Sequence, residues 1–104
     1  MAAKLQMFER RDGAARESVG MAAFAYCNAV KKQEGVTDSG FYWASPDEVA
    51  ILTTGSTAAA LEPKPEPNLA RALFSLSDVA RQTRMENWSD ARDGAALVQI
   101  IAQA

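Results

Sequence analysis

The stretch Gly40-Phe-Tyr-Trp-Ala-Ser-Pro-Asp-Glu-Val-Ala-Ile-Leu-Thr-Thr-Gly55 predicts a β-hairpin. Two runs rich in aromatic and β-branched residues flank Ser45–Glu48, and Pro46 presets the backbone angle needed at the second position of a type I turn. In both runs the apolar residues are adjacent instead of alternating with polar ones. Because successive side chains of a strand point to opposite faces, this hairpin presents apolar side chains to both faces of its sheet. The chain's own helices can cover one face, and we expect a second copy of the chain to cover the other.

Length and composition predict a single globular domain over residues 1–104. Hydrophobic residues make up 48% of the chain and charged residues 23%, which is ordinary for a globular protein and unlike a disordered one. The formal net charge is −2 and there is no long run of Lys or Arg, so we expect no nucleic-acid or anionic-membrane partner.

The sequence also predicts a soluble cytoplasmic protein. The first ten residues lack the uninterrupted apolar core of a signal peptide, and no stretch approaches the roughly 20 apolar residues that span a bilayer. The single cysteine, Cys27, excludes an intrachain disulfide and fits a reducing compartment. The abundance of Ala, and of Arg over Lys, is typical of a GC-rich bacterial genome.

The complete absence of histidine removes several kinds of chemistry. Ser–His and Cys–His nucleophile pairs cannot form, and a zinc site would rest on one thiolate and carboxylates. The sequence also lacks the glycine-rich motifs that hold nucleotide phosphates. We therefore expect no metal, haem or nucleotide cofactor, and any reaction must use other side chains or the substrate's own reactivity.

The chain before the hairpin predicts a strand and a long helix. The strand is expected over Ala3–Arg10, and Asp12 is placed to act as the N-cap of a helix. We expect that helix to run over Gly13–Glu34, with Gly35 just beyond its end. Apolar residues spaced by three and four positions define its inward face: Ala15, Val19, Ala22, Ala23, Tyr26 and Val30.

The chain after the hairpin predicts a second helix and a fourth strand. Ser56 is placed to cap a short helical turn, and the stiff connector Pro63–Pro67 leads to a helix that begins at Pro67 or Asn68. Gln82–Ser89 fits either a continued helix or an edge strand, and we favour the strand because it completes a known topology. Ala95–Ala102 predicts a terminal helix.

The resulting order is strand, helix, strand, strand, helix, strand and C-terminal helix, which is the ferredoxin-like α+β arrangement with both long helices on one face of an antiparallel sheet. The segments Gly40–Ala44, Asp47–Leu52 and Ala70–Ala80 resemble the dimeric α+β-barrel superfamily. This superfamily includes cofactor-independent antibiotic-biosynthesis monooxygenases and many small uncharacterised bacterial proteins. The resemblance implies a homodimer whose sheets pack face to face. Its haem-degrading members need a histidine, so that branch does not fit this chain.

Four side chains are the candidate ligand-binding residues: Tyr26, Asn28, Trp43 and Arg84. Large flat side chains with one polar edge suit a planar organic ligand, and the coarse topology places a cavity between the first helix and the sheet. The aromatic residues would otherwise be core or dimer-interface residues. Arg84 could hold an anionic ligand, or it could pair with Glu86 on the same strand face.

Two functions of different class remain open at the level of sequence. The first is a small enzyme that acts on an aromatic or polyketide-like molecule without a bound cofactor, in which the substrate supplies a reactive carbanion and the protein positions it and excludes water. The second is a non-catalytic dimer that binds a hydrophobic or aromatic small molecule or another protein. The fold carries both kinds of function, so it does not decide between them.

Overall fold

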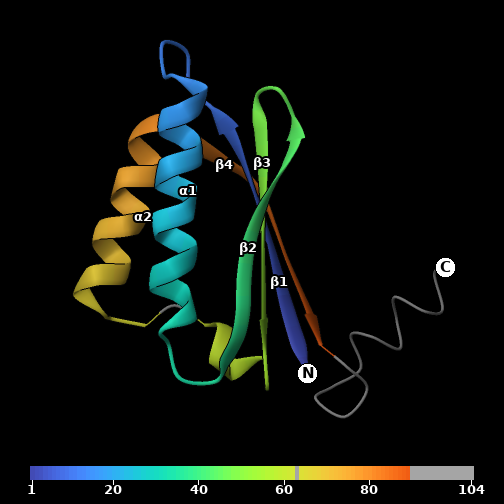
Figure 1. Ribbon diagram of the computed structural model, residues 1–104. Helices are drawn as coiled ribbons and strands as arrows, with labels where there is room; N and C mark the ends of the chain where they lie inside the picture. Colours follow the sequence, from blue (N-terminus) through green and yellow to red (C-terminus); the bar gives the residue numbers. More distant parts are fainter. Residues whose placement is uncertain (63, 90–104) are drawn as a thin grey trace, which may run out of the picture.

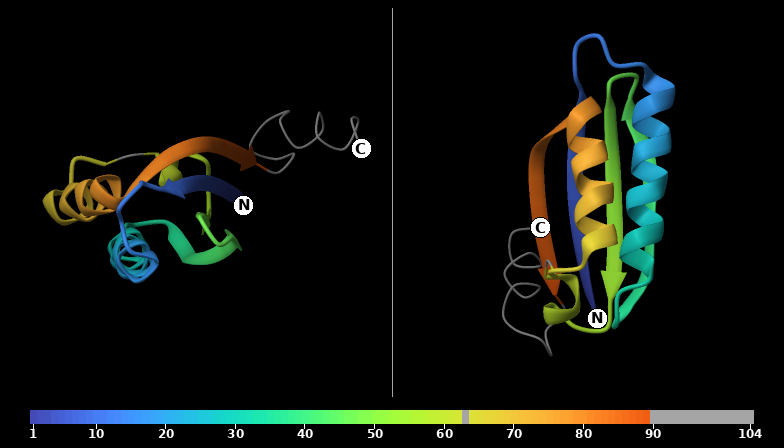
Figure 2. Two further views of the ribbon diagram at one scale, coloured as in Figure 1. Left: turned by 90° about the horizontal axis from the view of Figure 1, so that it is seen from above. Right: turned by 90° about the vertical axis from the view of Figure 1, so that its left-hand side faces the viewer.

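The computed structural model describes residues 1–62 and 64–89, and it has the ferredoxin-like α+β fold that the sequence predicts (Figure 1). The elements in chain order are β1 (Ala2–Arg10), α1 (Arg16–Lys31), β2 (Val36–Ser45), β3 (Glu48–Gly55), the short 3-10 helix η1 (Ala59–Leu61), α2 (Pro67–Val79) and β4 (Ala80–Ser89). The four strands form one sheet in the order β2-β3-β1-β4, and every neighbouring pair is antiparallel. Figure 2 shows both long helices on the same side of this sheet.

The core lies between the sheet and the two helices. Alternate residues of β1 and β3 face the helices, and Phe8, Val49 and Ile51 are almost completely buried there. The predicted inward face of α1 is confirmed in its central part, where Val19, Ala23, Tyr26, Cys27 and Val30 are buried. Removing apolar side chains of this size from water is the main force that holds such a domain together.

The opposite side of the sheet, which we call the open sheet face, is also apolar and carries no helix among the described residues. Because register pairs Leu5 with Leu52 and Met7 with Ala50, these four side chains share one face, and Tyr42 lies beside Ala50. Tyr42 is 62% exposed. The hairpin therefore presents apolar side chains to both faces, as its lack of alternation predicts.

The first helix is shorter than predicted at both ends. It begins at Arg16 because the backbone of Ala15 is extended, with ψ of 142°, and Gly13 before it adopts a left-handed conformation, with φ of 85°, which a helix cannot include. Ala15 occupies the N-cap position without a side-chain cap, so the prediction that Asp12 caps this helix is wrong. The helix ends at Lys31, and Gly35 lies in the left-handed region within the following turn.

The second helix begins at Pro67, as predicted. The side chain of Glu66 caps it by accepting hydrogen bonds from the backbone N–H groups of Asn68 and Leu69, at 3.2 and 2.8 Å. In the short turn before it, Ser56 is not the cap: Ala58 occupies the N-cap position of η1, and Thr57 Oγ1 accepts from the backbone N–H of Ala60 at 3.3 Å. The hydroxyl of Ser56 donates instead to a backbone carbonyl oxygen.

The segment Gln82–Ser89 forms the strand that we favour over a continued helix, as part of β4. Its pairing with β1 contains a bulge: Phe8 pairs with Gln82 whereas Met7 pairs with Arg84, so Thr83 is an extra residue. The bulge turns Gln82 to the helix side of the sheet and Arg84 to the open sheet face. The predicted terminal helix over Ala95–Ala102 lies outside the described residues.

Candidate functional site

A cavity of about 330 Å³ lies between the sheet and the two helices, and we call it the helix–sheet cavity. Its walls are largely apolar, with Val30 from α1, Leu69 and Leu73 from α2, and Met85 from β4. A volume of this size lies at the lower end of the range of small-molecule sites, which is about 300–1,000 Å³. The cavity can therefore hold a compact organic molecule.

A line of hydrogen-bonded polar side chains crosses the sheet side of this cavity. The Tyr26 hydroxyl donates to Gln6 Oε1 at 3.2 Å, and Gln6 Nε2 donates to Gln82 Oε1 at 3.1 Å. Gln82 reaches this line because the β4 bulge turns it to the helix side. Burial raises the pKa of the Tyr26 phenol above its ordinary value of 10.0, so the group is neutral at physiological pH.

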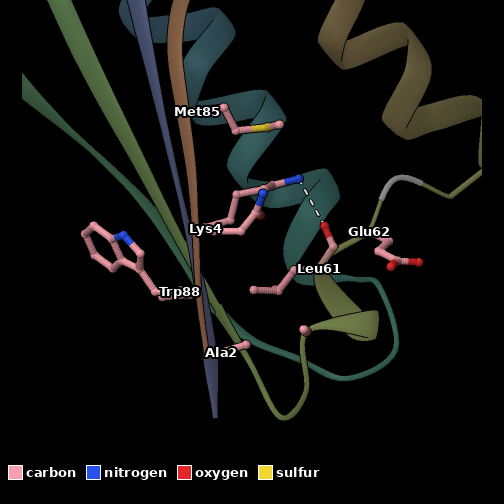
Figure 3. Close-up of a pocket in the computed structure, with 9 residues that line it drawn as sticks. Ala2, Lys4, Leu61, Glu62, Met85 and Trp88 are labelled. Carbon is pink, nitrogen blue, oxygen red and sulfur yellow. Dashed lines mark hydrogen bonds between the residues drawn. The ribbon is translucent and has the colours of Figure 1, made fainter. Parts of the chain in front are cut away.

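Two lysines lie at one end of the helix–sheet cavity. Lys4 comes from β1, and its Nζ donates to the backbone oxygen of Leu61 at 3.0 Å (Figure 3). Lys64 follows η1, and its Nζ donates to the backbone oxygen of Ala60 at 2.9 Å. Burial, assisted by the charge of Lys64, lowers the pKa of the Lys4 ammonium below 10.5.

A second cavity, of about 320 Å³, adjoins the first, and we call it the end pocket. Lys4, Leu61, Glu62 and Met85 line both cavities, so these residues stand where the two meet. Figure 3 shows Lys4 and Met85 on one side of the strands and the Trp88 ring on the other. Lys4 is therefore accessible to a ligand in either cavity.

Of the four predicted site residues, only Tyr26 lines the helix–sheet cavity. Trp43 lies on the helix side of β2, near Gly20, and the guanidinium carbon of Arg16 stands 4.1 Å from the centre of its ring. This distance is typical of a cation–π interaction. Trp43 is thus part of the packing between α1 and β2, away from the predicted position as a cavity wall.

The other two predicted residues lie elsewhere on the molecule. Asn28 lines an outer groove between α1 and α2, together with Lys32 and Arg71. Arg84 lies on the open sheet face, where it pairs with Glu86 at 2.8 Å, which is the ion pair weighed from the sequence. The structure does not bring the four residues together, and a ligand-binding role for each of them stays a prediction.

Sequence reasoning missed the polar lining residues other than Tyr26, and four of these, Lys4, Gln6, Lys64 and Gln82, form the hydrogen-bonded line and the lysine end of the cavity. A signal for two of them was present, because Lys4 and Gln6 alternate with Leu5 and Met7 and therefore share the helix-facing side of β1 with Phe8. Polar side chains on the core side of a strand indicate a polar site or a buried hydrogen-bond network. The other two depend on the β4 bulge and on the chain path after η1, for which the sequence gives no comparable signal.

Two further observations concern metal binding and membrane insertion. Among residues 1–62 and 64–89, no three His, Cys, Asp or Glu side chains gather in a way that could hold a metal ion. Neither of the long helices described above is sufficiently long and apolar to cross a membrane. The expectation that the protein needs no cofactor stays a prediction.

Comparison with known proteins finds a likeness in structure but none in sequence. No known protein family matches the sequence, and no curated protein matches it either. Rv0793 from Mycobacterium tuberculosis superposes with a TM-score of 0.70 at 16% identity, over 86% of this chain and 93% of that chain. SnoaB, a cofactor-independent oxygenase from Streptomyces nogalater, gives a TM-score of 0.70 at 8% identity, over 86% and 91% of the two chains. An antibiotic biosynthesis monooxygenase gives 0.71 at 11% identity, over 86% and 98%.

The chain therefore shares the ferredoxin-like α+β fold of antibiotic-biosynthesis-monooxygenase-like proteins, which confirms the resemblance drawn from the sequence. At these identities the likeness establishes the fold alone. The fold does not determine the reaction, which depends on the residues of the cavity.

Proposed function

We propose that the helix–sheet cavity binds a small aromatic or polyketide-like molecule and that the protein oxygenates it without a bound cofactor. The observation that carries this proposal is the cavity itself: an apolar space of about 330 Å³ with the hydrogen-bonded line Tyr26–Gln6–Gln82 along one side. Apolar walls that accept a flat ring, with a few polar groups to orient it, are the usual composition of such a site.

The reaction uses the reactivity of the substrate. A CH₂ group between aromatic rings or beside a carbonyl loses a proton to give a carbanion, and the carbanion transfers electrons to O₂. The CH₂ becomes C=O, one oxygen atom enters the product, and the other leaves as water. The contribution of the protein is to hold the carbanion in one orientation and to keep bulk water away.

The fold likeness supports this choice of reaction without deciding it. SnoaB has the same fold and is described as a cofactor-independent oxygenase, so the scaffold is compatible with this chemistry. At 8% identity its activity does not extend to this chain. The supporting evidence from this chain remains the cavity.

A non-catalytic role in binding a small molecule is the second candidate. It is favoured because two of the usual general bases are missing from the cavity: the chain contains no histidine, and burial keeps the phenol of Tyr26 protonated, which leaves the carboxylate of Glu62 and the two lysines among the lining groups. In this case the same cavity would bind the same class of molecule and leave it unchanged. Binding and turnover must therefore be measured separately.

We also propose that the protein is a homodimer in which two open sheet faces pack together. The apolar side chains Leu5, Met7 and Leu52 support this arrangement, because an apolar patch of this kind on a small domain usually marks an interface. The same face carries Arg84 and Glu86, which have opposite charges. In a two-fold symmetric dimer, each of them can therefore face the oppositely charged residue of the second copy. We expect an interface of about 1,600 Å² or more in total.

We place the protein in the cytoplasm of a bacterium. The thiol of Cys27 is free and buried, which suits a reducing compartment. The proteins of similar fold from Mycobacterium tuberculosis and Streptomyces nogalater are bacterial.

The test of function measures binding and turnover of anthrone, a tricyclic ketone with one reactive CH₂ group. Protein purified without additions is titrated with anthrone in the absence of oxygen by calorimetry. Oxygen uptake and anthraquinone absorbance are then followed in air. We expect binding, and one O₂ consumed for each anthraquinone formed, at a rate above that of the uncatalysed reaction.

A cavity-filling substitution controls this experiment. Ala70 lies on α2 and lines the helix–sheet cavity, so Ala70→Trp should abolish both binding and turnover. Ala25→Trp, on the outer groove, is the matched control and should leave both unchanged. Binding without turnover would support the non-catalytic candidate. Lack of binding to anthrone and related tricyclic ketones by the wild-type protein would overturn both candidates.

A further inference from the structure

We propose that Lys4 and Lys64 form an anion-binding end of the helix–sheet cavity, and that the ligand of this protein is an aromatic carboxylate. This inference rests on the proposed function only in that it takes the same cavity to be the ligand site. It adds the class of molecule: the ring would occupy the apolar part of the cavity, and the carboxylate would lie against the two ammonium groups.

The backbone brings the two ammonium groups close together. Lys4 Nζ donates to the carbonyl oxygen of Leu61 at 3.0 Å, and Lys64 Nζ donates to that of Ala60 at 2.9 Å. Ala60 and Leu61 are consecutive residues of η1, so both ammonium groups are held at the same turn. Besides burial, the charge of Lys64 lowers the pKa of Lys4, as expected for two ammonium groups held at one turn. Two like charges held this way repel each other.

Neither charge is neutralised in the described part of the chain. No acidic side chain within residues 1–62 and 64–89 forms an ion pair with Lys4 or Lys64. The nearby carboxylate of Glu62 points away from Lys4 (Figure 3). Both lysines are partly buried, and a charge removed from water is costly unless it gains a partner of opposite sign. An anion at this place would supply that partner to both groups.

The two ammonium groups also have N–H donors that the η1 carbonyl groups do not use. Each carries three N–H donors, and one of the three is used on the η1 carbonyl. A carboxylate has two oxygens that can accept from both lysines at once, through the short charge-assisted bonds that orient a ligand strongly. The end pocket beside Lys4 provides room for such a group next to the ring site.

The test compares matched acids and amides that differ in charge but hardly in shape. 2-Naphthoate is compared with 2-naphthamide, and anthraquinone-2-carboxylate with its carboxamide, by calorimetry at low salt. We expect the wild-type protein to bind each carboxylate about tenfold more tightly than its amide, as a partly desolvated charge pair should give. This preference should weaken at high salt, because ions screen the lysine charges.

Single substitutions assign the preference to the two lysines. Lys4→Met and Lys64→Met should each lose about threefold in affinity for the carboxylates, which is roughly half of the binding free energy behind the tenfold preference, while binding the amides as before. Lys32→Met, on the outer groove, removes the same charge away from the cavity and should have no effect. Unchanged amide binding also shows that each variant is folded.

Three outcomes would count against the inference, and they are distinguishable. Equal binding of acids and amides by the wild-type protein would overturn the anion site and leave the cavity intact as a ligand site. A carboxylate preference that is undiminished in both Lys4→Met and Lys64→Met would place the anion elsewhere. Failure of all four compounds to bind would overturn the ligand cavity itself, and the anion site with it.

Discussion

Tyr26 is the side chain whose environment is most clearly defined. It is 5% exposed, it lies on the inward face of α1, and its hydroxyl donates to Gln6 Oε1. A buried hydroxyl without a hydrogen-bond partner would lower the stability of the folded protein by about 1–3 kcal/mol. Because the bond forms in only one orientation of the two side chains, this cost holds both of them in place. The phenol thus gives the cavity a fixed, neutral polar group.

Tyr26 also predicts how stability depends on pH. Because its folded-state pKa is raised above 10.0, the phenol adds stability that is fully present below pH 10.0 and is lost as the pH rises through the folded-state pKa. Tyr26→Phe should be less stable at neutral pH by about 1–3 kcal/mol, since Gln6 loses its donor. The difference from wild type should narrow at alkaline pH, as measured by urea unfolding at several pH values.

The control for this prediction is built into the chain. Burial also raises the pKa of the Cys27 thiol above 9.0; because Cys27 is present in both proteins, the effect of its own burial cancels from the difference, and what remains is its charge, which adds to the rise in the Tyr26 pKa that burial causes. A difference in unfolding free energy that stays constant from neutral to alkaline pH would show that the phenol titrates normally.

At this scale, the sequence places Tyr26 at the cavity, whereas Trp43, Asn28 and Arg84 lie elsewhere. Tyr26 is placed correctly because helical periodicity fixes which side of α1 faces the sheet. Asn28 falls elsewhere because it is two residues after Tyr26, which is about 200° around α1 and therefore on nearly the opposite side of the helix. Arg84 falls elsewhere because of the β4 bulge, which no local pattern in the sequence encodes.

Local sequence signals predict which helices and strands form, but they do not predict the residues at which these elements begin and end. The hairpin and both long helices lie where turn residues and periodicity predict, and the fourth strand lies where the overall topology favours a strand over a continued helix. The beginning of α1 differs from the prediction because Asp12 is followed by a glycine in the left-handed conformation. A capping residue is effective only if the next residues are helical, and the sequence does not show whether they are.

Two glycines associated with α1 should respond in opposite ways to alanine. A Cβ at Gly20, inside the helix, would lie 3.7 Å from Trp43 Cζ2, which is an ordinary contact, so Gly20→Ala should stabilise the protein by about 0.5–1 kcal/mol. Gly35 has φ of 84°, and its Cβ would lie 2.7 Å from Ala60 Cβ. Gly35→Ala should destabilise the protein by more than about 1 kcal/mol.

Urea unfolding of both glycine variants measures these changes. Each variant is the control for the other, because the same methyl group is added in both. If Gly35→Ala were as stable as wild type, the turn between α1 and β2 would not need the left-handed conformation.

At the scale of the whole molecule, the two faces of the sheet differ in what covers them. The helix side is closed by α1 and α2, and Ile51 there is fully buried. On the open sheet face, Leu52 is only partly buried although it lies next to Ile51 in the chain. Association with a second copy through the open sheet face would remove this remaining apolar surface from water, which is why we expect a dimer.

Aspartate at these two neighbouring positions should separate folding from dimerisation. Ile51→Asp places an unpaired charge in the core and should prevent folding, with a cost above about 4 kcal/mol. Leu52→Asp places the same charge on the open sheet face, so the monomer should fold and the dimer should dissociate. Circular dichroism reports folding, and sedimentation at micromolar concentration reports the assembly.

Ser75→Asp, at an exposed position on the outer side of α2, is the matched control and should remain a folded dimer. A wild-type protein that sediments as a monomer at these concentrations would contradict the dimer. So would a Leu52→Asp variant that remains dimeric.

The bulge at Thr83 affects how this chain should be compared with its relatives. The extra residue reverses the side of the sheet to which residues after it point, so that Gln82 and Arg84 lie on opposite faces. An alignment with a relative that lacks the extra residue must open a gap at Thr83. Without that gap, each residue from 84 to 89 would be matched to a residue on the wrong side of the sheet, and residues of the helix side would be compared with residues of the open sheet face.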